Sequence, residues 1–239
     1  MSEVDQSDPA GSSRRVIVAT ARELVAKGYL RATGGNRTYL RDNILYHKDE
    51  LLQEADVPDI FQVLDRIAER PPAGANGVLY TPWIWGERAP VEDCRLRAGL
   101  HNLSLHNTRA DILRAFLEGI AFNTRWLLGP VEKFLGRQVP FLHIAGGGAQ
   151  SDIWCQIFAD VFDREIRQVA DLLVANARGA AGIAAAGLGG IAFGDVPGLV
   201  HFKRRYAPDA HNRVIYDERF AVFTQVYRQM KGVYRKMNQ

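Results

Sequence analysis

The sequence has little of several features that mark specialised classes of protein. It contains only two cysteines, Cys94 and Cys155, so a disulfide-rich secreted domain is excluded and reduced thiols are expected. Its net charge is +3, from 30 basic and 27 acidic residues, which is too small to indicate nucleic acid or an anionic membrane as partner. No apolar run is long enough to span a bilayer, and the polar first residues do not form a signal peptide. We therefore expect a soluble, cytoplasmic protein.

Patterns for metal binding and nucleophilic catalysis are also missing. The six histidines are scattered, and none has the spacing to a cysteine or carboxylate that a zinc site requires. The sequence has no G-x-S-x-G elbow, and no Lys-Ser/Thr pair follows the glycines at 146–148, which excludes a Walker loop. No catalytic and no metal-binding residue is predicted.

Apolar periodicity predicts an ordered domain behind a short tail. Residues 1–13 are almost devoid of apolar side chains and are expected to be disordered, whereas residues 14–239 are expected to form one domain. Helices are predicted over residues 15–27, 39–44, 61–68, 108–126, 151–163 and 175–188, and along a C-terminal stripe from Phe220 to Tyr234. Strands are predicted at 78–81, 140–145 and 164–169. Strands that alternate with helices indicate the α/β class.

The segment 140–163 is the most informative part of the chain. Gly146, Gly147 and Gly148 remove every Cβ from the turn between a predicted strand and a predicted helix. Ser151 or Asp152 can cap that helix. Such a unit offers free N–H groups and the positive end of a helix dipole to a phosphate. The motif alone also fits a tight structural turn without a ligand.

A dinucleotide-binding Rossmann unit is a second interpretation of this segment. Gly146 and Gly148 fit the first two glycines of G-x-G-x-x-G, and Asp171 follows the next strand, where a ribose-binding acid would lie. Ser151 occupies the position of the third glycine, however, so this hypothesis is not favoured.

A second cluster, the aromatic loop at residues 81–90, reads TPWIWGERAP. Its prolines and glycine predict a stiff loop that could border a binding cleft. The pattern fits equally well with a structural role, in which Trp83 and Trp85 pack inward and Glu87 and Arg88 pair with each other or with the loop backbone. Two further features have structural interpretations: His143 is expected to be a hydrogen-bonded core histidine, and the basic residues 203–205 to be a solvated loop.

Four segments follow one another along the chain. They are TPWIWGERAPVED, ADILRAFLEGIAFNTRW, AGGGAQSDIWCQIFADVFDREI and ARGAAGIAAAGLG. In this order they resemble the C-terminal half of the FGGY carbohydrate kinases, most of all the xylulokinase-like branch, from about residue 30 to the end. The resemblance implies an actin-like, ribonuclease-H-like ATPase domain with a mixed sheet flanked by helices. It also implies transfer of the terminal phosphoryl group of ATP to a sugar or polyol hydroxyl.

The resemblance assigns nucleotide-binding roles to particular residues. The glycines 146–148 match the family's loop that lies against ADP, with Gly147 as the first choice for close backbone contact. Ser151 matches a position near the adenosine, with Asp152 adjacent to it. Gly179 matches the small-residue helix beside the nucleotide pocket. ATP or ADP with Mg²⁺ are the implied cofactors.

The sequence departs from the family by what it lacks. It has no D-x-G-T phosphate loop, and no aspartate stands in the context of the family's catalytic base. We therefore expect half an enzyme, incomplete at its N-terminal end and inactive alone, with most sugar contacts outside the chain. Its expected partner is an N-terminal kinase half or a second copy, bound through a seam near residues 39–45 and the aromatic loop. The alternative is a catalytically inactive nucleotide-binding or regulatory module with the same fold.

Overall fold

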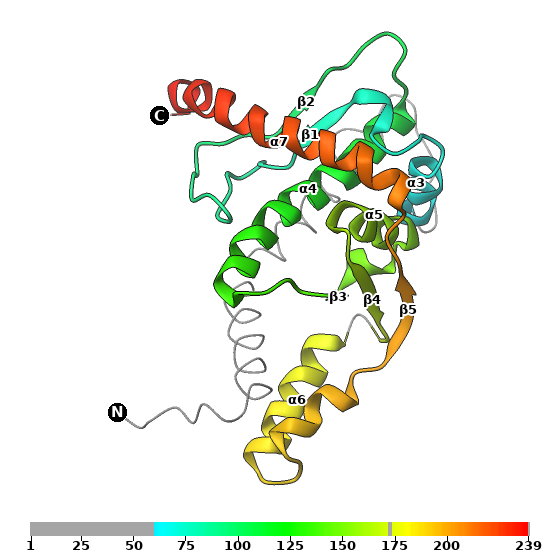
Figure 1. The fold of residues 1–239 in the computed structure, drawn as a ribbon, viewed down its shortest axis with the longest axis vertical. Helices are drawn as coiled ribbons and strands as arrows, with labels where there is room; N and C mark the ends of the chain where they lie inside the picture. Colours follow the sequence, from blue (N-terminus) through cyan, green and yellow to red (C-terminus); the bar gives the residue numbers. More distant parts are fainter. Residues whose placement is uncertain (1–59, 172–173, 239) are drawn as a thin grey trace, which may run out of the picture.

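The computed structural model describes residues 60–171 and 174–238 (Figure 1). The predicted tail and the predicted helices at 15–27 and 39–44 lie outside these residues. None of the described helices is both long enough and apolar enough to cross a membrane. In chain order the helices, 3-10 helices (η) and strands are α3 (Ile60–Ala68), η2 (Ala75–Gly77), β1 (Leu79–Thr81), β2 (Gly99–His101), α4 (Arg109–Leu135), β3 (Phe141–Ile144), η3 (Gly147–Gln150), α5 (Asp152–Phe162), β4 (Glu165–Val169), α6 (Ala175–Gly187), η4 (Phe193–Leu199), β5 (Phe202–Tyr206) and α7 (Ala210–Met237).

The helix α4 is the centre of the core. It begins where the sequence predicts, because Thr108 N donates a hydrogen bond to Asp111 Oδ2 at 2.6 Å and so caps the first turn. Strand β1, which pairs antiparallel with β2, lies against this helix at Gly119, where the absence of a side chain admits the backbone of Tyr80. The ring of Tyr80 stacks on Phe116 with centroids 3.6 Å apart. This contact buries all three residues of β1.

The second sheet has three strands in the order β3-β4-β5. Strand β4 pairs parallel with β3 and antiparallel with β5, so the sheet is mixed. The helix α5 connects β3 to β4 and packs between this sheet and α4 (Figure 1). Ile166 and Gln168 of β4 are buried and alternate with half-buried neighbours, as expected of a strand with one covered face. The α/β class predicted from the sequence is confirmed.

Helix α7 closes the core against α4, α5 and β1. Its buried residues include Tyr216 and Phe223. Glu118 of α4 is also buried, and its Oε1 accepts hydrogen bonds from Arg114 Nε at 2.8 Å, Tyr216 Oη at 2.9 Å and Gly74 N at 3.0 Å. A buried charge is stable in a fold only when it is paired in this way, so Glu118 joins α4 to α7 and to the segment before η2.

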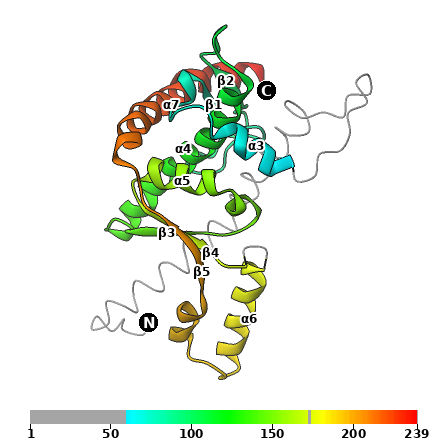
Figure 2. The ribbon, with the colours of Figure 1, turned by 90° about the vertical axis from the view of Figure 1, so that its right-hand side faces the viewer.

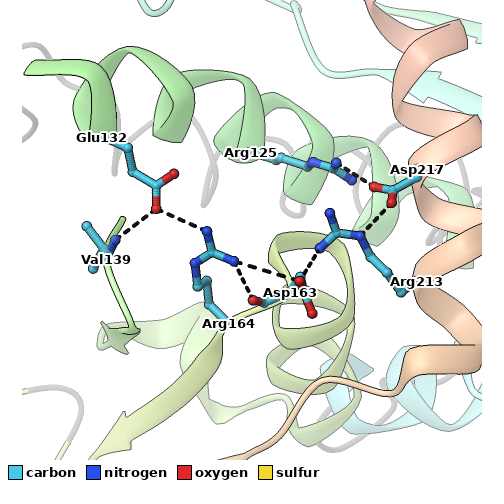
Figure 3. A network of polar contacts seen from close by, with 7 residues as sticks. All are labelled: Arg125, Glu132, Val139, Asp163, Arg164, Arg213 and Asp217. Atoms are coloured by element: carbon cyan, nitrogen blue, oxygen red, sulfur yellow. Dashed lines mark hydrogen bonds and ion pairs between the residues drawn. The ribbon is translucent and has the colours of Figure 1, made fainter. Parts of the chain in front are cut away.

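A network of charged residues ties α7 to the end of α5 and to α4 (Figure 3). Asp217 accepts hydrogen bonds from Arg125 at 2.5 Å and from Arg213 at 2.7 Å, and Arg213 also pairs with Asp163 at 3.0 Å. Burial opposes the charge of Asp217, but these two arginines outweigh it and lower the pKa of its carboxyl group below 3.8. The other members of the network are Glu132, Val139 and Arg164.

Helix α6 and η4 lie beyond the three-stranded sheet, away from α4 and α7 (Figure 2). They pack mainly on each other. A Cβ atom added at Gly182 of α6 would lie 3.3 Å from Val196 Cγ1 of η4. Much of their apolar surface is exposed, including Ile183, Leu188 and Phe193. These two elements therefore add little to the main core.

Two structural expectations from the sequence are wrong. Residues 203–205 form part of β5 and are not a loop, because their backbone pairs with β4 while their charged side chains stay exposed at the sheet edge. His143 is exposed and is not a core residue, since it lies on the face of β3 opposite Leu142 and Ile144, which pack against the core. Its ring lies 5.4 Å from that of Phe141 and 4.7 Å from that of Phe202, measured between centroids.

Candidate functional site

The glycine turn, defined here as residues 146–150, connects β3 to α5. Gly146 has φ of +94°, a conformation that favours glycine. The turn then tightens, because Ala149 N donates to Gly146 O at 3.0 Å and Ser151 N donates to Gly148 O at 3.3 Å. The amides of Gly147 and Gly148 come before Ala149 N, which is the first donor within the turn. They correspond to the first amides of a helix, which have no acceptor inside the helix. They are the groups that this turn can offer to an anion.

The three glycines have different surroundings. A side chain on Gly147 would meet no atom of the described residues within 4 Å, so within this part of the chain its backbone faces open space. A side chain on Gly148 would lie 2.6 Å from the ring of Trp154, so this glycine is needed for packing. Gly146 is needed for its positive φ. Of the three predicted glycines, Gly147 alone is free of a structural duty and can admit a ligand.

Ser151 and Asp152 lie at the start of α5, as predicted, and both are engaged with the protein. Ser151 is buried, and its Oγ accepts a hydrogen bond from Trp154 N at 3.2 Å, which confirms it as the N-cap. The carboxylate of Asp152 accepts from Tyr206 Oη at 2.7 Å and from Arg204 at 2.9 Å. Arg204 thereby offsets the negative charge of Asp152 at the N-terminal end of α5. This is the end of a helix that attracts anions.

Gly179, the sixth predicted site residue, lies on α6 and not on the turn. A side chain there would also meet no described atom within 4 Å, whereas Gly182 one turn later faces Val196. Gly179 thus belongs to the open side of α6, where a ligand could approach its backbone.

The aromatic loop places its two tryptophans in opposite environments. Trp83 is fully buried, and its Nε1 donates to Asn123 Oδ1 at 3.1 Å, whereas Trp85 is 92% exposed. Glu87 holds the loop in this shape, because its carboxylate accepts from Arg88 N at 2.8 Å and from Asn123 at 2.7 Å. The predicted inward packing is therefore right for Trp83 and wrong for Trp85, and a role of the loop beside a binding cleft stays a prediction.

The sequence did not predict the residues of the three-stranded sheet that hold the glycine turn in place. Gln168 of β4 is fully buried, and its Nε2 donates to the carbonyl oxygen of Ala149 at 2.6 Å. Tyr206 of β5 lies at hydrogen-bond distance from both Gln168 and Asp152. The available signal was the alternation in β4, which puts the polar Gln168 on the same buried face as Ile166.

No cluster of three or more His, Cys, Asp or Glu side chains in residues 60–171 and 174–238 is arranged to hold a metal ion. A metal at this site would therefore depend on a ligand's own oxygens or on residues outside this part of the chain.

Comparison with known proteins relates this geometry to one family. Residues 3–188 match the C-terminal domain of the FGGY family of carbohydrate kinases. The xylulose kinase of Staphylococcus epidermidis is 30% identical over 173 residues, which is 72% of this chain and 34% of that protein. The chain thus spans about a third of the length of the curated relatives it matches.

Solved structures show the same likeness. The gluconate kinase from Lactobacillus acidophilus matches 85% of this chain and 39% of its own, with a TM-score of 0.73 and 22% identity. The glycerol kinase of Plasmodium falciparum, solved with ADP, matches 81% of this chain and 36% of its own, with a TM-score of 0.64 and 21% identity.

Proposed function

Because this chain belongs to the FGGY family of carbohydrate kinases and has their actin-like ATPase fold, we propose that it is the nucleotide-side domain of an ATP-dependent sugar kinase. The complete kinase would transfer the terminal phosphoryl group of ATP to a hydroxyl of a sugar or polyol, in the cytoplasm. The observation that supports a nucleotide here is the open backbone at Gly147, beside the start of α5. The family match supports the kind of nucleotide.

The described residues fit the phosphate end of a nucleotide. The amides of Gly147 and Gly148 would donate to phosphate oxygens, and the positive end of α5 would stabilise their charge. Ser151 and Asp152 would border the nucleotide from the first turn of α5, and Gly179 would approach it from α6. Mg²⁺ would arrive on the phosphates, which it commonly does in phosphoryl-transfer enzymes, and no described residue is assigned to it.

The chain by itself would not catalyse the transfer. Phosphoryl transfer needs a group that accepts the proton of the attacking hydroxyl, and no residue of this sequence has the expected context. The chain spans about a third of its relatives, so we assign the base and most sugar contacts to an N-terminal kinase half. A regulatory module is not favoured, because the relatives are named as kinases.

Calorimetric titration with MgADP tests the nucleotide site. Gly147→Val adds a branched side chain to the space that the phosphates would fill, so affinity should fall by about tenfold or more, a loss of about 1.4 kcal/mol. Gly232→Val in α7 is the matched control, since a side chain there also meets no atom of the part of the chain that the structure describes within 4 Å, and its affinity should equal that of the wild type. Equal binding by the wild type and Gly147→Val would exclude the glycine turn as the contact.

Complementation tests the kinase itself. The probe is the N-terminal part of the S. epidermidis xylulose kinase, ended where its match to this chain begins. We expect ADP release that depends on xylulose from the mixture and none from either part alone. Turnover by this chain alone would refute the assignment of the base to another polypeptide. A chain that binds MgADP but restores nothing would instead support the inactive module, and light scattering on the same samples would show whether it self-associates.

A further inference from the structure

The carbonyl oxygen of Ala149 is the point where the glycine turn is attached to the sheet. Ala149 is 1% exposed, and its oxygen accepts from Gln168 Nε2 at 2.6 Å and from Cys155 Sγ at 3.6 Å. A buried carbonyl must be satisfied by the protein, and a thiol is a weak donor. The amide of Gln168 is therefore the stronger of the two donors that hold this oxygen.

Gln168 is itself held in place from β5. Its Oε1 lies 3.4 Å from Tyr206 Oη, and the same hydroxyl donates to Asp152 Oδ1 at 2.7 Å. Arg204 pairs with the other oxygen of Asp152 at 2.9 Å. These contacts join β5 to β4, β4 to the glycine turn, and β5 to Asp152, the first residue of α5. They therefore support the turn on the side that faces the protein.

We propose that Gln168 is a positioning residue, which sets the affinity of the glycine turn for nucleotide by fixing the carbonyl of Ala149 while touching no nucleotide itself. This inference rests on the proposed function. Its reason is preorganisation: the amides of Gly147 and Gly148 can meet a phosphate without a loss of freedom only if the turn already has its bound shape. Burial raises the pKa of Cys155 to about 12, so its thiol keeps its proton and remains a donor to Ala149 O, but a weak one that cannot replace the amide of Gln168.

The test compares two glutamines that make the same kind of bond. Gln168→Met keeps the length of the side chain but removes the donor to Ala149 O. Gln156→Met is the control, because Gln156 Nε2 donates to another backbone carbonyl, that of Ala207, at 2.8 Å and to Asp160 Oδ1 at 2.7 Å, and neither acceptor belongs to the glycine turn. We expect Gln168→Met to weaken MgADP binding by about tenfold and Gln156→Met to leave it unchanged. Tyr206→Phe, a milder change, should weaken binding by about threefold.

Amide hydrogen exchange gives a readout that needs no nucleotide. Exchange in residues 146–151 should become about tenfold faster in Gln168→Met and stay unchanged in Gln156→Met, at a temperature where circular dichroism shows all variants folded. Unchanged exchange in Gln168→Met, or unchanged affinity despite faster exchange, would overturn the inference. If the wild type binds no MgADP, the proposed function fails, and exchange alone then decides whether Gln168 positions the turn. If Gln168→Met does not fold, Tyr206→Phe supplies both measurements.

Discussion

Two regions of this chain depend on glycine for opposite reasons. At Gly119 of α4, a methyl group would overlap the carbonyl oxygen of Tyr80, so the glycine exists to let a strand and a helix meet. At Gly147 of the glycine turn, a methyl group would meet nothing within 4 Å among residues 60–171 and 174–238. The first glycine is required by the fold, and the second has no structural requirement that the described residues reveal. An open glycine between a strand and a helix is therefore the better indication of a ligand.

The surroundings of the two glycines differ in the same way. Strand β1 beside Gly119 is buried at every residue, whereas β3, which leads to the glycine turn, is only half-buried and has an exposed His143. Residues 115–123 of α4 are all buried. Stability is thus concentrated around α4, and the candidate site lies at the margin of this core, where backbone groups remain accessible.

The largest expected effect is at Gly119. Gly119→Ala should destabilise the chain by about 3 kcal/mol or more, because the overlapping atom belongs to the backbone of β1 and cannot rotate away. Gly129→Ala in the same helix is the control: its side chain would meet nothing within 4 Å, so it should stabilise the chain by up to about 1 kcal/mol. Urea denaturation measures both. Equal stabilities for the two variants would show that the fold does not require a glycine at position 119.

The two cysteines give an effect of intermediate size. Cys94 is exposed, whereas Cys155 is buried below the glycine turn with its pKa raised to about 12 by burial. Iodoacetamide at pH 8 should modify Cys94 at least about a hundredfold faster than Cys155, because only the thiolate reacts. Mass spectrometry of the digested protein measures both rates. Rapid modification of Cys155 in the folded wild type would show that the turn is not closed against α5.

The smallest expected effect concerns Asp217 in the network of Figure 3. Its pKa is lower in the folded chain than its ordinary value of 3.8, so it stabilises the fold above that value and loses this contribution as pH falls through the folded pKa. Asp217→Asn should therefore lower stability at pH 7 and make little difference near pH 2.

The size of this loss should be below about 1 kcal/mol, because the Asp217 side chain is 44% exposed and solvent screens the pair. Urea midpoints of wild type and variant at pH 7, 5 and 3 measure it. A difference between the two proteins that does not shrink at low pH would show that Asp217 acts by packing and not by charge.

The long elements could be predicted from the sequence because their patterns are local. The apolar stripes of α4, α5 and α7, and the strand–glycine–helix unit around 146–148, lie where periodicity and capping residues indicate. Strand β5 was missed, because Lys203 to Arg205 carry no apolar alternation and become a strand only by pairing with β4. The burial of Trp83 and the exposure of Trp85 could likewise not be predicted from any local pattern.

The sequence by itself determined the α/β class, because that class follows from the order of strands and helices along the chain. It also determined a helix start near Thr108, a second at Ser151 or Asp152, and the glycine turn as the candidate site, because each of these depends on residues close together in the chain. Only the tertiary structure decided which glycine is open, since that depends on where Trp154 and Tyr80 pack. It also decided that Gln168, 19 residues from Ala149, holds the turn. Contacts across such distances form when strands align, and no local pattern of residues encodes them.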